Sequence, residues 1–297
     1  MAKIGIFDSG YGGLTILEAI RKQLPQYDYL YLGDNARAPY GTHSFDVIYR
    51  YTLQAVKYLI EQDCALVILA CNTASAKALR TIQQRDLPEI NDKLQMSNHK
   101  SQRVNVLGVI RPTVEAVPAI TKTGHVGILA TPATVSSESY VLELEKISDM
   151  LVVVQQSCPM WVPLIEAGEH TSDGAKYFVG EYLRAILAKD PQIDTLVLGC
   201  THYPLLKNEI DHWLAYHQEI EQSEFPNPVK THPVQTISQG ELVAKSLADY
   251  LSRHAEYREQ LSQGGSCAYL TTENADRFAQ SASVFLSTPI EAQHIDL

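Results

Sequence analysis

Two segments of this 297-residue chain share one pattern, an apolar run that ends at a cysteine. Residues 66–71 read LVILAC, and residues 196–200 read LVLGC. Polar residues follow each cysteine at once, and both segments then continue into a pattern that can begin a helix. A short, continuous apolar run is typical of a strand that is covered on both faces. We therefore expect each cysteine to lie at the carboxyl end of a buried parallel strand and at the start of a helix.

Strand and helix patterns alternate along the chain around these two segments. Strands are expected at residues 4–7, 27–32, 65–70, 104–110, 125–130, 151–154, 195–198 and 234–237. Helical patterns lie between most of them, and this alternation predicts doubly wound parallel sheets of the α/β class. The stretch from Arg85 to Arg103 is polar and has little periodicity, so we interpret it as a loop or a ragged helix end. We also expect a loop at residues 158–163.

The two halves of the chain also begin alike. Residues 3–9, KIGIFDS, match residues 125–131, HVGILAT, in residue class at most positions. The interval from each of these starts to the following cysteine is similar. The repeat predicts two pseudo-symmetric α/β domains with the active site in the cleft between them. The expected first domain covers residues 1–105 and 238–297, and the second covers residues 106–237.

Composition limits the partners that such a chain can have. A formal net charge of -10 argues against nucleic acid or an anionic membrane as the main partner, because both favour clustered lysine and arginine. No apolar run is long enough to cross a bilayer, and no targeting segment precedes the first strand. The five cysteines are odd in number and scattered, without a CxxC motif. Reduced thiols and a cytoplasmic location are therefore expected.

Cys71 and Cys200 carry the chemistry that we expect. A helix N-terminus favours thiolate over thiol, and Asp8 and His202 are candidate acid–base neighbours, one from each half. A carbon acid that loses a proton from one face and regains it on the other needs one base and one acid on opposite sides. Two thiols can exchange these roles when the reaction reverses. The pair therefore predicts a two-base racemase or epimerase.

Other residues are assigned by their type. The remaining cysteines, Cys64, Cys158 and Cys267, are interpreted as small apolar core residues. Hydroxyls, an amide and backbone donors suited to substrate carboxylates are offered by Ser9, Tyr40, Gly41, Asn72, Thr73 and Thr201. Asp8 can receive an ammonium group. Glu166 is either a solvated residue at a helix end or a neighbour of the site.

Two alternatives remain open from the residues alone. A cysteine hydrolase could use a thiolate beside His202 to attack a carbonyl, although it would leave one of the two cysteines unexplained. A non-catalytic amino-acid binding protein could also consist of two α/β lobes around a cleft. We expect neither a metal nor a cofactor, since the glycine loop at residues 10–13 fits no nucleotide motif and no lysine stands out as a site for pyridoxal phosphate.

The motifs together resemble those of the glutamate racemases, which act without a cofactor. The resemblance lies in FDSGYGGL at residues 7–14, GD at 33–34 with PYG at 39–41, ACNTA at 70–74 and LGCTHYPLL at 198–206. It implies interconversion of L- and D-glutamate, with D-glutamate supplied for peptidoglycan synthesis, cell wall biogenesis and cell shape. It further implies a homodimer and a chain end that returns to the first domain.

The resemblance also implies roles for individual residues. Cys71 would take the proton from the D-enantiomer and Cys200 from the L-enantiomer. Substrate contacts are implied for Asp8, Ser9, Tyr40, Gly41, Asn72, Thr73, Thr201 and His202.

Three features depart from the family pattern. Ser238 stands where an acidic residue is usual, residues 85–103 look like an insertion, and the tail after about Arg253 is long. We expect this tail to shape a dimer or to cover a sheet edge.

Overall fold

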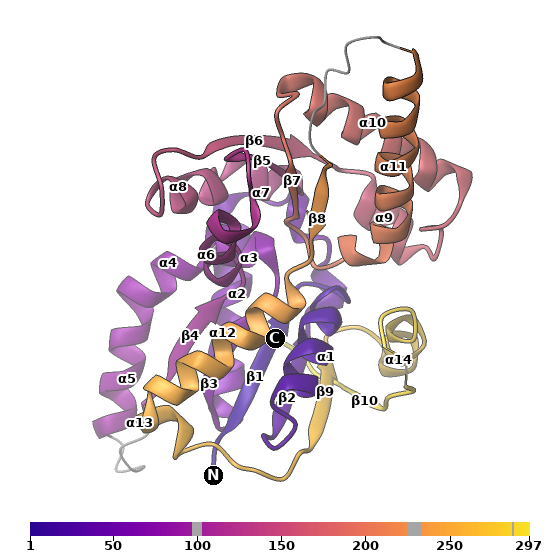
Figure 1. Ribbon diagram of the computed structural model, residues 1–297. Coiled ribbons are helices and arrows are strands. Elements are labelled where there is room, and N and C mark those ends of the chain that lie inside the picture. Colours follow the sequence, from indigo (N-terminus) through magenta and orange to yellow (C-terminus); the bar gives the residue numbers. More distant parts are fainter. Residues whose placement is uncertain (97–102, 225–232, 287) are drawn as a thin grey trace. The chain divides into compact units, whose positions relative to one another are not determined.

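The computed structural model describes residues 1–96, 103–224, 233–286 and 288–297 (Figure 1). The chain divides into two compact units, Met1–Pro112 with Gly240–Leu297, and Thr113–Gln239. Within the described ranges, none of the helices combines the length and apolar character that a membrane crossing requires.

The first unit contains a six-stranded sheet in which every strand pair is parallel. Its order is β10-β9-β2-β1-β3-β4, with bounds β1 Lys3–Asp8, β2 Tyr29–Gly33, β3 Cys64–Leu69, β4 Asn105–Gly108, β9 Cys267–Thr271 and β10 Ala292–His294. Every residue of β2 and β3 is buried, because the sheet is covered by helices.

The helices of this unit are wound around the sheet. They are α1 Gly13–Gln23, α2 Phe45–Glu61, α3 Asn72–Lys77, α4 Leu79–Thr81, α5 Leu87–Met96, α12 Gly240–Arg253, α13 Ala255–Arg258 and α14 Ala275–Ala282. Helix α6, Ile110–Ile120, begins in this unit and continues into the second. The apolar face of α1 packs against α12, so the returning chain end covers the first helix (Figure 1). Helix α2 packs on β3 and α3.

The second unit contains a four-stranded parallel sheet of order β6-β5-β7-β8. Its strands are β5 His125–Ala130, β6 Val152–Ser157, β7 Thr195–Leu198 and β8 Gln235–Ile237. Its further helices are α7 Pro132–Ser136, α8 Ser139–Glu145, α9 Trp161–Glu166, α10 Asp173–Lys189 and α11 Lys207–Glu224. Strand β7 is buried along its whole length.

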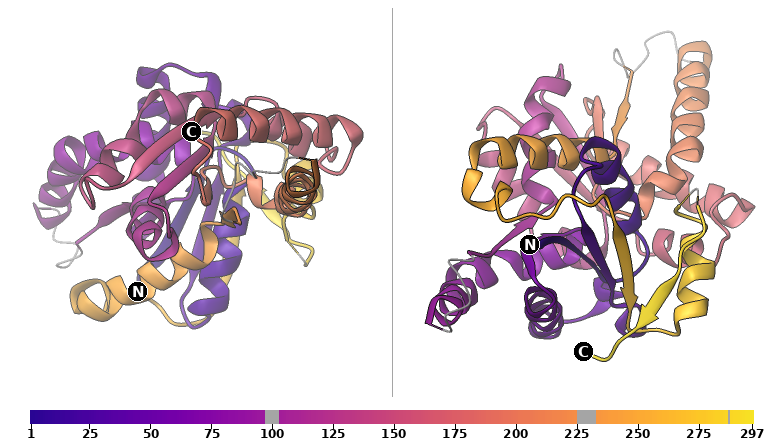
Figure 2. Two further views of the ribbon diagram at one scale, coloured as in Figure 1. Left: turned by 45° about the horizontal axis from the view of Figure 1, so that its top comes forward. Right: turned by 90° about the horizontal axis from the view of Figure 1, so that it is seen from below.

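The two sheets repeat one strand order. The series β2-β1-β3-β4 in the first unit corresponds to β6-β5-β7-β8 in the second, so β3 and β7 hold equivalent central places. The predicted fold class, two pseudo-symmetric parallel α/β sheets, is confirmed. The C-terminal tail makes the two sheets different. Strands β9 and β10 extend the first sheet beyond β2 (Figure 2), whereas β6 stays at the edge of the second sheet.

Three local expectations were wrong. Residues 82–96 are a continuous helical stretch, a π-helical segment Ile82–Asp86 followed by α5, where a loop or a ragged helix end was expected from residue 85 on. Residues 97–102 of the expected loop lie outside the described residues. Polar side chains hold this helix in place, since Gln83 Nε2 donates to the Val106 carbonyl and Asn91 Nδ2 to the Val104 carbonyl. This is why apolar periodicity did not predict it.

The other two differences concern β4 and α9. Strand β4 pairs with β3, so residues 106–108 belong to the first sheet rather than to the second domain expected from the sequence. Residues 161–166 form α9 instead of continuing the loop after Cys158, because Trp161 and Ile165 are one helical turn apart and both are buried.

Candidate active site

Cys71 follows β3 and is the N-cap residue of α3. Its sulfur accepts a hydrogen bond from the Ala74 backbone N–H at 3.4 Å, and Ser9 Oγ lies 3.3 Å from the same sulfur. Ser9 comes directly after β1, the parallel neighbour of β3, which brings together residues 62 positions apart. The side chain is nearly buried at 5% exposure. A thiolate at this position would be stabilised by the helix N-terminus and by the hydroxyl.

Asp8 is the last residue of β1 and is buried. Its Oδ2 accepts a hydrogen bond from the Gly10 N–H at 3.0 Å. Helix α1 starts close against this carboxylate, because a Cβ atom at Gly13 would lie 2.5 Å from the Asp8 Cβ. Glycine at that position is therefore required by close packing, and the glycine loop helps to hold Asp8 in place.

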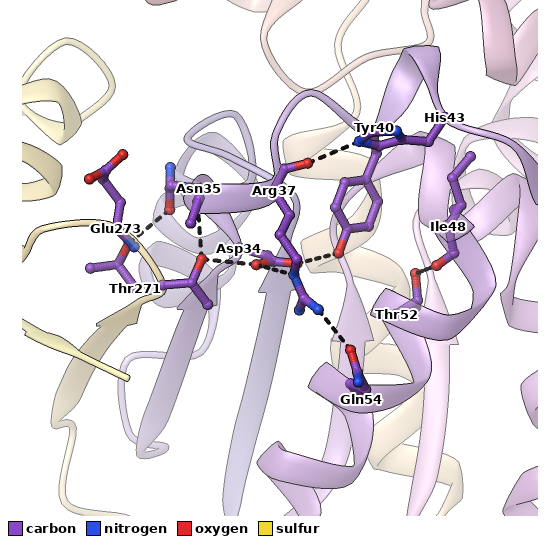
Figure 3. A network of polar contacts seen from close by, with 12 residues as sticks. Asp34, Asn35, Arg37, Tyr40, His43, Ile48, Thr52, Gln54, Thr271 and Glu273 are labelled. Carbon is purple, nitrogen blue, oxygen red and sulfur yellow. Dashed lines mark hydrogen bonds and ion pairs between the residues drawn. The ribbon is translucent and has the colours of Figure 1, made fainter. Parts of the chain in front are cut away.

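Asp34 is the centre of a buried polar network in the first unit (Figure 3). Its carboxylate accepts from Arg37 Nε at 2.7 Å, from Thr272 Oγ1 at 2.9 Å and from the Tyr40 hydroxyl. Burial and the Asp34 charge raise the pKa of the Tyr40 phenol. The Tyr40 hydroxyl thus donates its hydrogen to Asp34.

Cys200 follows β7 in the second unit and is 7% exposed. Its sulfur lies 3.8 Å from His202 Nδ1, and His202 Nε2 lies 2.9 Å from Glu166 Oε1, at the end of α9. Burial lowers the pKa of His202, but the hydrogen bonds and charges of Cys200 and Glu166 outweigh it and raise that pKa to about 10. A protonated imidazole can stabilise a neighbouring thiolate or help to transfer a proton to it.

Glu166 resolves the question that the sequence left open, because it is a direct partner of His202. It lies 36 positions before the histidine and sits on a six-residue helix that was not predicted. No periodic signal links the two positions. The nearest clue was its place just beyond the expected loop at residues 158–163, which follows a strand.

The other predicted site residues also follow strand ends. Asn72 and Thr73 form the first turn of α3 after Cys71, and Thr201 follows Cys200; all three are buried. The structure thus groups the predicted residues by unit. The first unit holds Asp8, Ser9, Tyr40, Gly41, Cys71, Asn72 and Thr73, and the second holds Cys200, Thr201 and His202.

The three remaining cysteines differ from this pair. Burial raises the pKa of the Cys64 thiol to about 12 and that of Cys158 well above its usual range. Cys267 is only half-buried, unlike the core residue expected, and its pKa is also raised by desolvation. Thiols of this kind stay protonated near neutral pH and are poor bases.

Two parallel α/β units of matched strand order, each with a cysteine after its third strand, fit the class of two-base racemases that the sequence predicts. The sequence pattern of the family described as Asp/Glu/Hydantoin racemase matches residues 14–216, and the chain belongs to that family.

The individual relatives and solved structures that resemble this chain include several glutamate racemases. The glutamate racemase of Ruegeria sp. (strain TM1040) is 39% identical over 297 residues, 97% of each chain, and that of Roseobacter denitrificans is 40% identical over 298 residues, 97% of this chain and 98% of the relative. Among solved structures, glutamate racemase isoform RacE1 from Bacillus anthracis matches with a TM-score of 0.82 at 28% identity, covering 100% of this chain and 98% of that one. The glutamate racemase of Francisella tularensis in complex with D-glutamate matches with a TM-score of 0.79 at 31% identity, covering 100% and 97%. The resemblance read from the motifs is confirmed.

Proposed function

We propose that this chain interconverts L- and D-glutamate by two-base proton transfer at Cα. One observation carries the proposal. In each unit a cysteine lies two residues after the equivalent central strand, β3 or β7, and its sulfur has a polar hydrogen-bonding neighbour. A hydrolase or a binding protein requires no such duplication.

The proposed reaction begins from opposite protonation states of the two sulfurs. With D-glutamate, the Cys71 thiolate removes the Cα proton, and the Cys200 thiol donates its proton to the other face of the carbanion. With L-glutamate the two roles are exchanged. One proton is taken and one is given in each turnover, so no oxidant, reductant or co-reactant is consumed. Solvent exchange then resets the two thiols.

The neighbours of each sulfur have proposed roles. His202, held by Glu166, stabilises the thiolate of Cys200, and Asp8 is the acid–base neighbour on the side of Cys71. Backbone N–H groups at helix starts suit the substrate carboxylates, and the Asp8 carboxylate suits the ammonium group. Substrate binding is assigned to Asp8, Ser9, Tyr40, Gly41, Asn72, Thr73, Thr201 and His202.

Deuterium incorporation tests this mechanism. Purified protein incubated with L-glutamate in deuterated water should yield D-glutamate that carries deuterium at Cα, measured by mass spectrometry after chiral separation. Absence of both racemisation and Cα exchange in the folded protein would overturn the proposal. The same experiment with L-aspartate tests substrate choice, and we expect far slower exchange.

A cysteine hydrolase is the second candidate, because Cys200, His202 and Glu166 form a thiol–imidazole–carboxylate series. Such a series can activate a nucleophile. A hydrolase would release a burst of product from a glutamyl amide or ester and form an acyl-enzyme at Cys200. We expect neither, and a burst without Cα exchange would favour hydrolysis.

The proposed physiological role is the cytoplasmic supply of D-glutamate for peptidoglycan by a homodimer. Expression of the chain in a bacterium that requires external D-glutamate should remove that requirement, whereas the Cys71→Ser variant should not. Light scattering coupled to size-exclusion chromatography would give the mass of the assembly. A mass of one chain at working concentration would contradict the dimer.

A further inference from the structure

Gln239 lies where the chain leaves the second unit. The chain passes between the units at two places, from Pro112 to Thr113 and from Gln239 to Gly240. The Gln239 side chain is 2% exposed, and its Nε2 donates to Thr113 Oγ1 at 2.9 Å. One buried amide therefore joins the two chain crossings to each other.

The same amide also reaches towards the candidate active site. Gln239 Nε2 donates its second hydrogen to the Tyr140 hydroxyl oxygen, also at 2.9 Å. Tyr140 is fully buried on α8, so both contacts are shielded from water. Buried hydrogen bonds of this kind fix side-chain positions, since an amide that loses its partners there is costly.

Tyr140 in turn packs against the residue before Cys200. A Cβ atom at Gly199 would lie 3.2 Å from Tyr140 Cε2 and 3.1 Å from the Leu129 carbonyl oxygen. The Gly199 N–H donates to that same carbonyl at 2.8 Å. The backbone that carries Cys200 is thus held between the end of β5 and the tyrosine ring. Burial raises the pKa of the Tyr140 phenol and the nearby Cys200 raises it further, so the phenol stays neutral.

We propose that Gln239 is a positioning residue for Cys200, because its amide ties both chain crossings to the tyrosine ring that supports the Gly199–Cys200 backbone. The inference rests on the proposed role of Cys200 as an acid–base group. It gives a structural role to residues 238–239, where this chain departs from the family pattern. A chain that lacks the usual acid at position 238 supplies a neutral amide one residue later.

Ser238 provides the matched control. It precedes Gln239 at the same crossing, and within the described part of the chain its buried Oγ has no hydrogen-bond partner. Ser238→Ala therefore changes the local packing without removing a hydrogen bond between described residues. Gln239→Met keeps the length of the side chain and removes both donated hydrogens.

The test compares the two thiols within one protein. Slow alkylation with iodoacetamide, followed by peptide mass spectrometry, gives separate rates for Cys71 and Cys200. In Gln239→Met the Cys200 rate should rise at least about threefold through local loosening, with Cys71 unchanged. The kcat for glutamate should fall about tenfold with KM nearly constant, because the variant displaces Cys200 and leaves the contacts that bind glutamate in place. Ser238→Ala should match the wild type in both measurements.

A second variant keeps the proposal testable if Gln239→Met folds poorly. Tyr140→Phe retains the ring and removes only the oxygen, so it should reproduce the selective change at Cys200. In the double variant the effects should not add, since both substitutions remove the same hydrogen bond between Gln239 and Tyr140. Equal changes at Cys71 and Cys200, or no change at either, would overturn the inference. Labelling does not depend on turnover, so this result is independent of the deuterium experiment.

Discussion

The two cysteine sites occupy equivalent places in equivalent sheets, yet their surroundings differ. In the first unit, a serine hydroxyl and a backbone N–H lie 3.3 and 3.4 Å from the Cys71 sulfur. Cys200 has an imidazole that is itself held by a carboxylate. A repeated scaffold thus supports two different ways to stabilise a thiolate, one by dipoles and one by a charged side chain.

This difference has a physical consequence for a reaction that runs both ways. The equilibrium constant for interconversion of two enantiomers is one, so kcat/KM must be equal in the two directions. Unequal surroundings can therefore make kcat and KM differ between the two directions, but the ratio kcat/KM stays the same in both. The comparison between the sites is best tested by variants that change one surrounding at a time.

The largest effect is expected from the sulfurs themselves. Cys71→Ser and Cys200→Ser should each reduce racemisation by a factor on the order of a thousand or more, because a hydroxyl is a far weaker acid than a thiol. Each variant should exchange the Cα proton of only one enantiomer, measured in deuterated water. Cys267→Ser is the control and should keep full activity. Full racemisation by either active-site variant would break the assignment of two bases.

A smaller effect is expected from the carboxylate behind His202. Glu166→Gln keeps the shape of the side chain but removes the charge that helps to raise the pKa of the imidazole. We expect kcat to fall roughly 10- to 100-fold. The alkylation rate of Cys200 should change and that of Cys71 should not. An equal change at both sulfurs would mean that the two sites are not independent.

The pH dependence of stability should also separate the sites. The pKa of His202 is raised from 6.5 to about 10, so its contribution to stability is complete below pH 6.5 and is lost as the pH rises through about 10. The Tm difference between wild type and His202→Asn should therefore be largest near neutral or lower pH and should shrink towards pH 10. The difference for Ser9→Ala should not shrink towards pH 10, because the serine hydroxyl stays neutral and can donate to Cys71 whether the sulfur is a thiol or a thiolate. A constant gap for His202→Asn would contradict a raised pKa.

The smallest effect is expected from Ser9→Ala itself. It removes one hydrogen-bonding neighbour of Cys71, and the helix N-terminus remains. A roughly fivefold loss in kcat follows from the usual strength of one such bond. Steady-state kinetics in both directions would measure it. A loss as great as that of Glu166→Gln would show that the hydroxyl, and not the helix, is the main support of Cys71.

Much of the candidate site could be predicted from the chain because its residues follow strand ends. Cys71, Asn72 and Thr73 come one residue beyond β3, and Cys200 with Thr201 one residue beyond β7, so a short apolar run located each group. The contact between His202 and Glu166 could not be predicted in this way. Glu166 lies on a short helix whose only clear signal is the burial of Trp161 and Ile165.

The sequence by itself determined the strand ends, the two cysteines, the repeat and the family motifs, because all of these depend on residues that are neighbours in the chain. Only the tertiary structure decided that Ser9 contacts Cys71, that Gln239 joins Thr113 to Tyr140, and that β9 and β10 extend the first sheet at β2. Those contacts depend on strand order and on polar side chains that bond across long separations. Apolar periodicity reports which face of an element is buried, but it carries no information about which distant element covers that face.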